Sequence, residues 1–571
     1  MSAEVSLTLI GTATRTHEPT VKRKLPVLTL EKFLGEQQTL TAVEKFSDLH
    51  ESGEVQEKHK IYRDLLPLTK PQNGQQYAFE VDLDACTGCK ACVTGCHSMN
   101  GLDQAETWRG VGFLHGGTSE APAARLVTSS CHHCLEPACM SGCPVQAYEK
   151  DPVTGIVKHL DDQCFGCQYC TLMCPYDAPK YNKRLGIVRK CDMCSDRLAN
   201  EEAPGCVQAC PNGAISIRIV DQLHVIQASE AHSFLPSTPT PEHTVPTTRY
   251  TSKKPFPPNM LAGDFYSVKA EHSHPALVIM LTLTQLSVGA FALSLGLESL
   301  TGRASGSPLA QAALACFLAV LALGASVFHL GRPWLFFRAV LGLRTSWLSR
   351  EALCFGFFAK LALLYGGLLA LPSALPSAVY LPYAPLIESV AHSARVGASV
   401  FGILGVFSSV MVYVATRRVE WQAEETGIRF FGSFLLLGAA AVLTMSAVPS
   451  ETPLGEADLR VLLSLILGVS VLKLAFEARV LTHLRAPRQS VLKRQAILLT
   501  GQLRTATKLR FGAALLGGVL LPAALLSLGP LSAYVGVFGP ALLLALLVGE
   551  FAERYLFFSA APASHMPGPL P

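Results

Sequence analysis

Sixteen of the eighteen cysteines lie between Cys86 and Cys210, in four groups of four. The groups are Cys86-x2-Cys89-x2-Cys92-x3-Cys96, Cys131-x2-Cys134-x4-Cys139-x3-Cys143, Cys164-x2-Cys167-x2-Cys170-x3-Cys174 and Cys191-x2-Cys194-x11-Cys206-x3-Cys210. Proline follows the last cysteine of every group but the first. The run C-x2-C-x2-C-x3-C-P holds [4Fe–4S] clusters, and its fourth cysteine serves the other cluster of a pair. The four groups therefore predict four such clusters, and a row of clusters conducts electrons.

Disulfide bonds and zinc are the other common uses of so many cysteines. A disulfide framework is typical of secreted chains, whereas the first 25 residues contain neither an apolar stretch nor a twin-arginine signal. Zinc sites use separated Cys-x2-Cys pairs rather than triplets followed by Cys-Pro. The spacing therefore favours iron–sulfur clusters over both alternatives.

The 571 residues suffice for two or more domains, and the net charge of +4 is too small to indicate a partner. We predict an N-terminal extension over 1–77, a four-cluster domain over 78–225, a linker over 226–270 and a membrane domain over 271–571. The linker is rich in Pro, Thr and Ser, so we expect an extended connector without a core. Residues 31–51 have helical apolar spacing and could pack on their own domain or on a partner.

The second half supplies eight apolar stretches of the length that a membrane-spanning helix needs, about 20 residues. The predicted spans are 276–296, 309–329, 352–372, 396–416, 430–448, 461–478, 511–529 and 532–553. The predicted fold is thus an α+β tandem ferredoxin-like iron–sulfur domain followed by an all-α membrane bundle of eight helices. We expect contact with membrane lipid and no nucleic-acid partner.

Positive charge is distributed very unequally between the two sets of loops, with sixteen Arg or Lys residues against three. The larger set is Arg332, Arg338, Arg344, Arg350, Arg417, Arg418, Arg429, Arg479, Arg485, Arg488, Lys493, Arg494, Arg504, Lys508, Arg510 and Arg554, and the smaller set is Arg303, Arg395 and Arg460. Basic residues collect on the cytoplasmic side of a membrane. Both ends of the chain and the iron–sulfur domain are therefore predicted to face the cytoplasm, which points to the bacterial inner membrane.

Local motifs now connect the two halves to known proteins. Residues 78–220, with DLDACTGCKACVTGCH at 82–97, resemble the four-cluster electron-transfer subunit of the dimethyl sulfoxide reductase type of molybdopterin oxidoreductase. Residues 271–571 resemble the matching membrane anchor, with the motifs His329-Leu-Gly-Arg-Pro333, Ser346-Trp-Leu-Ser-Arg-Glu351 and Gly549-Glu-Phe-Ala-Glu-Arg554. The whole sequence is thus similar to a fusion of these two subunits.

The resemblance implies a nested pairing of the cysteine groups. The implied ligand sets are Cys86, Cys89, Cys92 and Cys210; Cys191, Cys194, Cys206 and Cys96; Cys131, Cys134, Cys139 and Cys174; and Cys164, Cys167, Cys170 and Cys143. Some relatives replace one cysteine of the third group with tryptophan, but this sequence keeps all of them. The first group ends in Cys96-His97 rather than Cys-Pro, which is expected to alter backbone stiffness and not ligation.

The resemblance also implies that membrane quinol, menaquinol or ubiquinol, is oxidised near His329 and Glu351. Quinol oxidation needs a hydrogen-bond partner and a proton acceptor, and both residues lie at predicted helix ends on the cluster side. Their simpler roles are a helix cap for His329 and an ion pair with Arg350 for Glu351. Lys360 is a further candidate, because a cation within a span costs roughly 2.5–3.5 kcal/mol, although its side chain could instead snorkel. Glu550 is expected to pair with Arg554, four residues on.

No haem is expected, because the histidines of the second half lie at or beyond the predicted helix ends. No catalytic apparatus for a terminal substrate is visible, so we predict a subunit that passes electrons from the quinone pool to a separate bis-pterin molybdopterin subunit in anaerobic respiration. Electrons could also run the other way, from a formate or polysulfide type of dehydrogenase into the quinone pool. A redox-gated transporter or sensor is a remote alternative, since only Pro522 clearly interrupts a span.

Overall fold

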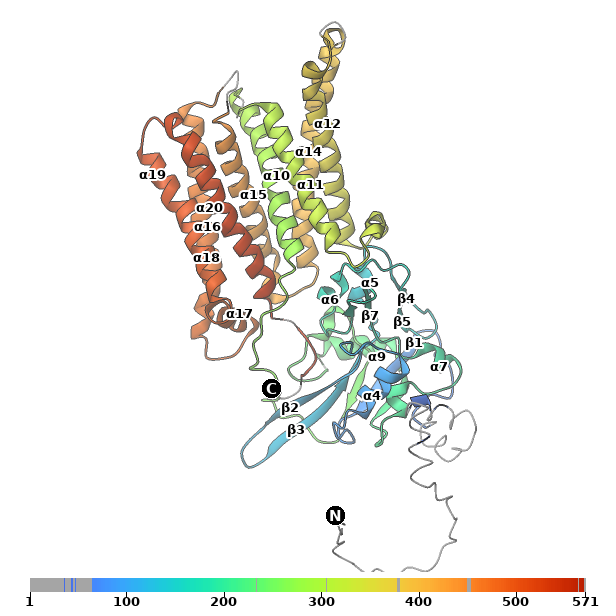
Figure 1. The fold of residues 1–571 in the computed structure, drawn as a ribbon. Coiled ribbons are helices and arrows are strands. Elements are labelled where there is room, and N and C mark those ends of the chain that lie inside the picture. Colours follow the sequence, from blue (N-terminus) through green and yellow to red (C-terminus); the bar gives the residue numbers. More distant parts are fainter. Residues whose placement is uncertain are drawn as a thin grey trace, which may run out of the picture. The chain divides into compact units, whose positions relative to one another are not determined.

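A computed structural model gives the fold of the protein (Figure 1). It describes residues 64–568 except 233, 304–305, 377–379, 449–452 and 563, together with positions 35, 43, 44 and 47. Lys60–Pro571 forms one compact unit, and nearly all of Met1–His59 lies outside the described residues. The same holds for most of the helix predicted over 31–51, although the four described positions there are helical.

The cysteine-rich region is built on small sheets. In the first sheet β1 (Gln75–Asp82) pairs antiparallel with β8 (Ile215–Asp221) and parallel with β9 (Arg249–Thr251). The second sheet has the order β10 (Leu261–Ala262), β2 (Gly110–Gly117), β3 (Pro122–Ser129), and two hairpins are β4 (Tyr148–Lys150) with β5 (Val157–His159) and β6 (Lys180–Asn182) with β7 (Ile187–Arg189). The strands thus form a set of small layers around the cysteines rather than one large sheet.

Short helices lie between these strands, and five of the sixteen cysteines fall inside them. They are α4 (Ala91–Met99), α5 (Ala138–Ser141), α6 (Tyr169–Met173), α7 (Ser195–Ala199) and α8 (Gly205–Gln208), followed by α9 (Gln222–Glu230). Left-handed residues precede α4 and α6, namely Lys90 with φ 62° and Gln168 with φ 61°. These sharp turns lie inside the Cys-x2-Cys-x2-Cys runs and fold each run back on itself.

The predicted linker does not behave as a coreless connector. Its strands β9 and β10 pair with β1 and β2, and Thr244, Val245 and Thr247 are buried. The domain boundaries also move: residue 78 lies inside β1, and residues 225 and 226 both lie inside α9. Proline and threonine content indicated a solvated segment, but hydrogen bonds to two sheets hold it against the cysteine-rich core.

The described residues after the linker contain eight long apolar helices, which confirms the predicted bundle. They are α10 (Pro275–Thr301), α11 (Pro308–Phe328), α12 (Trp347–Ala374), α14 (Ala384–Val414), α15 (Ala423–Met445), α16 (Glu456–Arg479), the composite of α18 (Arg504–Leu515), η6 (Leu516–Leu520) and α19 (Leu521–Ser527), and α20 (Ser532–Ser559). The short helix α17 (Val491–Thr500) and the 3-10 turns η1 (Pro241–His243), η2 (Pro333–Val340), η3 (Leu381–Tyr383), η4 (Val419–Trp421) and η5 (Val480–Arg485) lie in the connecting segments.

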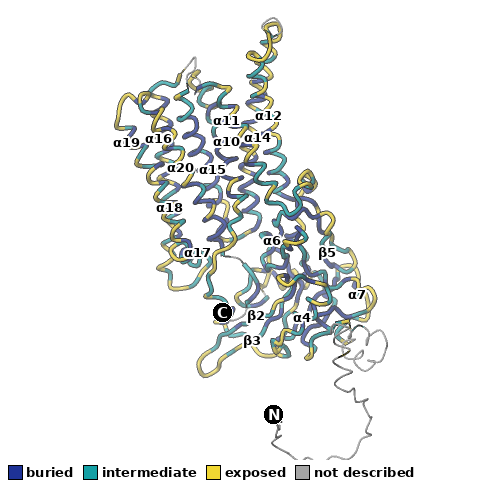
Figure 2. The backbone as a smooth tube through the Cα atoms, in the orientation of Figure 1, coloured by how far each residue is buried: buried dark blue, intermediate teal, exposed yellow. Residues whose placement is uncertain are grey.

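Two helices form the centre of the bundle, as Figure 2 shows by their dark colouring. α10 packs against α11, α14, α15 and α20, and α15 packs against α10, α16 and α20. Outer helices expose large apolar side chains such as Phe317 and Leu321, which suits a surface in contact with lipid. Pro372 and Pro540 also lie inside helices, so Pro522 is not the only proline within a span.

The C-terminal tail returns to the cysteine-rich region after α20. The amide of Phe113 in β2 donates to the carbonyl of Gly568 at 3.0 Å, and the amide of Gly568 donates to Asp264 at 3.1 Å. Met566 is buried in the core of that region. The bundle is therefore attached to the cysteine-rich region at both of its ends, through the linker before α10 and through this tail.

Candidate functional site

Two of the four predicted thiol sets line hollows in the cysteine-rich region. Cys86, Cys89, Cys92 and Cys210 surround one, and Cys131, Cys134, Cys139 and Cys174 surround the other. None of the described cysteines is joined in a disulfide bond. Among the described residues, no group of three His, Cys, Asp or Glu side chains converges on a single ion. The thiols are thus arranged around cavities, which is the arrangement that a multi-iron cluster requires.

In the other two sets, the thiols lie close enough to raise one another's pKa values. Burial raises the pKa of Cys96, and the thiols of Cys206 and Cys194 raise it further. Burial likewise raises the pKa of Cys170, as do Cys167, Cys143 and Cys164. Each predicted set of four therefore contains thiols that are close neighbours in space although they come from distant parts of the sequence.

The four sets follow one another in a row. Cys206 of the second set interacts with Cys92 of the first, and Cys191 of the second set interacts with Cys131 of the third. Tyr148 lies within electrostatic reach of Cys139 of the third set and Cys170 of the fourth. A row of cluster sites would therefore run from the first set to the fourth.

Buried cations lie between neighbouring thiol sets. Arg109 is fully buried beside thiols of the first and second sets and donates to Thr128 and Ser130 at 3.2 and 2.9 Å. Lys190 is buried beside thiols of the second and third sets. Buried charges are usually paired, and four thiolates with iron and sulfide form an anionic group. The residues present therefore fit iron–sulfur clusters in charge as well as in position.

The fourth set lies against the membrane bundle. Tyr169 of α6, next to Cys170, donates its hydroxyl to the carbonyl of Val412 in α14 at 2.6 Å. Ser346, the residue before α12, donates to the carbonyl of Gly142 at 2.7 Å. These contacts bring a cluster-binding segment to the ends of the membrane helices, where an electron donor in the membrane could reach it.

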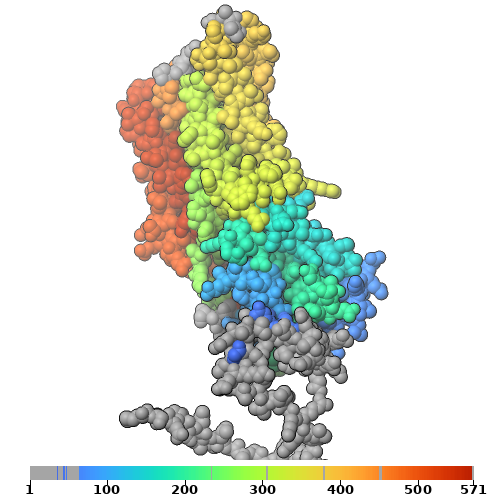
Figure 3. All heavy atoms as spheres, turned by 45° about the vertical axis from the view of Figure 1, so that its right-hand side comes forward, coloured from blue at the N-terminus to red at the C-terminus, as the bar shows by residue number. Residues whose placement is uncertain are grey.

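The motif at 329–333 also docks on the iron–sulfur region, which lies directly against the bundle in Figure 3. Arg332 donates to the carbonyl of Asp161 at 2.8 Å, and its amide donates to the carbonyl of Phe165 at 3.0 Å. Gly331 packs so closely that an added Cβ would lie 2.1 Å from the carbonyl oxygen of Gly186. The glycine and the arginine of the motif therefore hold the end of α11 against the iron–sulfur region.

His329 is the C-cap residue of α11, as predicted for its position. Its ring lies against the backbone of Cys167, and burial lowers its pKa below the usual value for histidine. The ring centroid of His274 is 5.2 Å away, and burial lowers the pKa of His274 to about 4. Two neutral imidazoles thus lie beside the fourth thiol set. The sequence showed His274 only as a residue at a helix end.

Glu351 lies in the first turns of α12 and is only 5% exposed. The hydroxyl of Ser409 in α14 donates to its carboxylate. Tyr169 and Tyr413 are close enough to Glu351 to interact with it electrostatically. The alternative role of Glu351, an ion pair with Arg350, is absent from the described structure. Arg350 instead donates to backbone carbonyls and stacks over Trp347.

The structure brings His329 and Glu351 to one segment of the iron–sulfur region, without a direct contact between them. His329 touches it at Cys167 and Glu351 approaches it at Tyr169. Lys360 does not join them: it is exposed on the outer surface of α12, with its Nζ 6.0 Å from the Phe357 ring centroid. His392 lies within α14 and is exposed, although a position at a helix end was expected.

Glu550 does not form the predicted pair with Arg554. Its carboxylate binds Lys473 of α16 and Arg510 of α18, the latter at 2.7 Å, and Arg510 also binds Glu477 at 2.7 Å. The sequence did not reveal this buried charge network, because the mean hydropathy of each span stays high in spite of a few charged residues. Its further members are Arg429, Ser433, Glu553, Arg554 and Gln285. Three arginines of the network, Arg429, Arg510 and Arg554, were counted among the loop residues in the sequence. In the structure all three lie inside helices.

Comparison with known proteins matches both halves. The family model of the 4Fe-4S dicluster domain matches residues 123–219, and that of the DMSO reductase anchor subunit (DmsC) matches residues 270–559. The B subunit of the anaerobic dimethyl sulfoxide reductase of Haemophilus influenzae is 35% identical over 175 residues, which are 29% of this sequence and 84% of that protein. The B subunit of the same reductase of Escherichia coli (strain K12) is 37% identical over 156 residues, 26% of this sequence and 76% of that protein.

A dehydrogenase subunit is also similar. The formate dehydrogenase iron-sulfur subunit of Haemophilus influenzae is 30% identical over 162 residues, 25% of this sequence and 52% of that protein. Fold and site define a multi-pass membrane protein with an iron–sulfur electron-transfer region. This protein belongs to the DMSO reductase anchor subunit (DmsC) family, here fused to an iron–sulfur part related to the B subunit of that reductase. It serves electron transfer and membrane anchoring.

Proposed function

We propose that the protein oxidises a membrane quinol, menaquinol or ubiquinol, and passes the electrons to a separate bis-pterin molybdopterin subunit. The observation that supports this most is the contact of the Cys167–Tyr169 segment with both His329 and the surroundings of Glu351. The four ligand sets are those predicted from the sequence, and the proposed path needs no haem. Bound [4Fe–4S] clusters would accept and transfer electrons one at a time.

Oxidation of a quinol to a quinone releases two electrons and two protons. His329, neutral because burial lowers its pKa, can accept a hydrogen bond from one quinol hydroxyl. Glu351 can accept a proton at the other side of the segment, with Ser409 orienting its carboxylate. Tyr413, which lies near Glu351, belongs to a buried apolar cluster that would keep water from a bound quinol. The fourth thiol set, nearest to the membrane, would be the entry point for electrons.

Electron flow from a dehydrogenase to the quinone pool is the second candidate. It is favoured by the similarity to the formate dehydrogenase subunit of Haemophilus influenzae. The same row of thiol sets would then conduct from the first set to the fourth, and Glu351 would donate the proton that the quinone takes up. Steady-state assays of the complex with each substrate pair distinguish the two directions.

Sixteen irons per polypeptide are expected, because sixteen cysteines form four sets of four. Iron and sulfide analysis of the anaerobically purified protein, combined with EPR of its reduced form, measures this number. About twelve irons, or a three-iron signal in fresh protein, would contradict the assignment of all four sets, because each set holds one four-iron cluster.

We further propose that the iron–sulfur region faces the cytoplasm at the inner membrane. The loops that bear most of the basic residues lie at the same end of the bundle as this region, since Arg332 and Arg338 donate to its carbonyls. The catalytic partner would then also be cytoplasmic, and protons from quinol would be released on the side where the substrate consumes them.

Reporter fusions at the C-terminus test this orientation. A fluorescent protein should be bright and alkaline phosphatase inactive, and protease should reach the iron–sulfur region only from the cytoplasmic side of oriented vesicles. Active phosphatase at this end would place the region outside the cytoplasm.

A further inference from the structure

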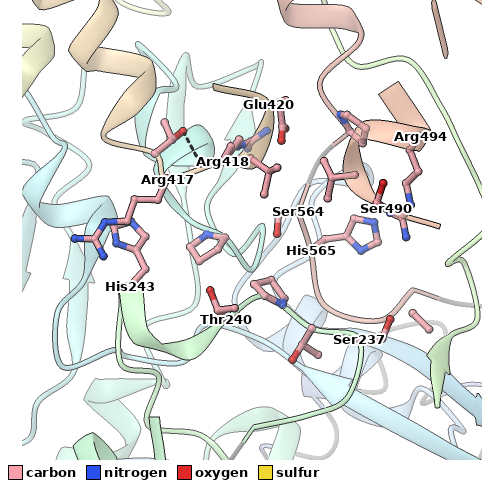
Figure 4. Close-up of a pocket in the computed structure, with 18 of the residues that line it drawn as sticks. Ser237, Thr240, His243, Arg417, Arg418, Glu420, Ser490, Arg494, Ser564 and His565 are labelled. Atoms are coloured by element: carbon pink, nitrogen blue, oxygen red, sulfur yellow. Dashed lines mark hydrogen bonds between the residues drawn. The ribbon is translucent and has the colours of Figure 1, made fainter. Parts of the chain in front are cut away.

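A cavity of about 590 Å3 lies between the bundle and the iron–sulfur region (Figure 4). This volume is in the range of small-ligand sites, about 300–1,000 Å3. Its walls are the loop after α14, the start of α17, the C-terminal tail and the residues around η1 and β10. The loop after α14 and the C-terminal tail follow membrane helices directly, so the cavity lies at the end of the bundle on the cluster side.

Three arginines line this cavity, Arg417, Arg418 and Arg494. Within the described part of the molecule, none of the three forms a salt bridge. Asp264 offsets the charge of Arg494 electrostatically and also lies 3.5 Å from His565. Glu242 and Glu420 also line the cavity, and Glu242 pairs with His232 at 3.4 Å. Arg417 and Arg418 therefore form the end of the cavity where guanidinium groups are adjacent and free of salt bridges within the described residues.

The surroundings of Arg417 and Arg418 constrain each of them differently. Arg417 has φ 54°, a left-handed conformation that costs a non-glycine residue about 1–3 kcal/mol and persists only where the surroundings impose it. Arg418 packs its guanidinium over Trp421, 4.9 Å from the ring centroid. Burial lowers the pKa of Arg418 in spite of the nearby Glu420. Glu271 and Asp177 also interact electrostatically with Arg418, but no described carboxylate forms a salt bridge with either arginine.

Two further polar groups at this end lack a partner in the described structure. Neither ring nitrogen of His243 makes a hydrogen bond, and burial together with Arg417 lowers the pKa of His243 to about 4. One carboxylate oxygen of Glu420 also has no partner, and burial raises the pKa of Glu420. A neutral imidazole can donate a hydrogen bond to an anion, and His243 has no other partner in the described structure.

We propose that the Arg417–Arg418 end of the cavity binds a phosphate-bearing anion, supplied by an anionic phospholipid headgroup or by free phosphate. Guanidinium groups bind phosphate through paired charge-assisted hydrogen bonds. Basic pockets between membrane helices on the cytoplasmic side accept anionic headgroups. The bound anion would neutralise the two arginines and join the loop after α14 to the iron–sulfur region.

Thermal unfolding of the full-length protein, loaded with clusters and stripped of lipid in neutral detergent, tests the proposal. Added phosphatidylglycerol should raise the Tm, because a ligand that binds the folded state stabilises it, whereas phosphatidylcholine should not. In the double variant Arg417→Gln/Arg418→Gln, the lipid concentration needed for half of the shift should rise about ten-fold or more, the loss of about 1.4 kcal/mol of binding free energy. Arg488→Gln, an exposed arginine of the same face outside the cavity, should respond as the wild type does.

A parallel titration with inorganic phosphate distinguishes a lipid headgroup from free phosphate as the bound anion. If inorganic phosphate alone raises the Tm as much as phosphatidylglycerol, and the double variant loses this response, the site is assigned to free phosphate. If the glutamine variant does not fold, the variant Arg417→Lys/Arg418→Lys, which keeps both charges, replaces it. Its affinity for the anion should be lower than that of the wild type, because lysine lacks the paired donors of arginine. The proposal is overturned if neither anion shifts the wild-type Tm, or if the variants respond as the wild type does.

Discussion

Glu351→Gln in the full-length protein should slow the reduction of its clusters by a quinol analogue by about 100-fold or more, the range of a lost general base. Glutamine keeps the shape of the side chain and can still bond Ser409, but it cannot accept the quinol proton. Reduction by dithionite should be unchanged, because it does not pass through the quinol site. Stopped-flow absorbance under anaerobic conditions measures both rates.

Two variants accompany this measurement. His329→Ala should raise the quinol concentration needed for half-maximal rate, since a hydrogen-bond partner is lost beside Cys167. Glu388→Gln, an exposed carboxylate of α14, should leave both rates unchanged. Normal reduction by quinol in both the Glu351 and the His329 variant would place the quinol site elsewhere.

Glu550→Gln should lower the free energy of unfolding by about 3–5 kcal/mol, the cost of removing one member of a buried ion pair. The carboxylate of Glu550 binds Lys473 and Arg510, and all three side chains are buried inside the bundle. The neutral glutamine would leave Lys473 and Arg510 buried without the negative charge that now pairs with both. Equilibrium unfolding in mixed detergent micelles measures the change.

Glu388→Gln again supplies the control, because an exposed substitution usually changes stability by less than about 0.5 kcal/mol. The double variant Lys473→Met/Glu550→Leu should be less destabilised than the sum of its single variants, since it removes both charges of one pair. A loss of stability for Glu550→Gln no larger than that of the control would show that the network is not a buried, charged one.

The cysteine spacing predicted the local runs, and the resemblance implied the nested sets that the structure brings together. Ligand spacing is a local property, so sequence alone reveals it. Packing between distant segments is not local. The approach of Tyr169 to Val412 joins residues 243 positions apart, and nothing in either neighbourhood indicates it.

Amino-acid composition gave wrong predictions in places where specific contacts determine the structure. The Pro- and Thr-rich segment was expected to be an extended connector, yet its strands pair with β1 and β2, because strand pairing needs backbone groups and not apolar side chains. Mean hydropathy identified all eight spans but gave no sign that Lys473, Arg510 and Glu550 neutralise one another inside them. Four-residue spacing predicted a pair between Glu550 and Arg554, and longer-range partners took its place.

Anaerobic mixing of the purified wild-type protein with a menaquinol analogue, followed by EPR, tests the central claim most directly. No catalytic partner is added, so any electrons in the clusters must have entered through the membrane half. The account predicts signals of reduced [4Fe–4S] clusters after quinol addition and their loss in Glu351→Gln. Clusters that stay oxidised with quinol, while dithionite reduces them fully, would contradict it.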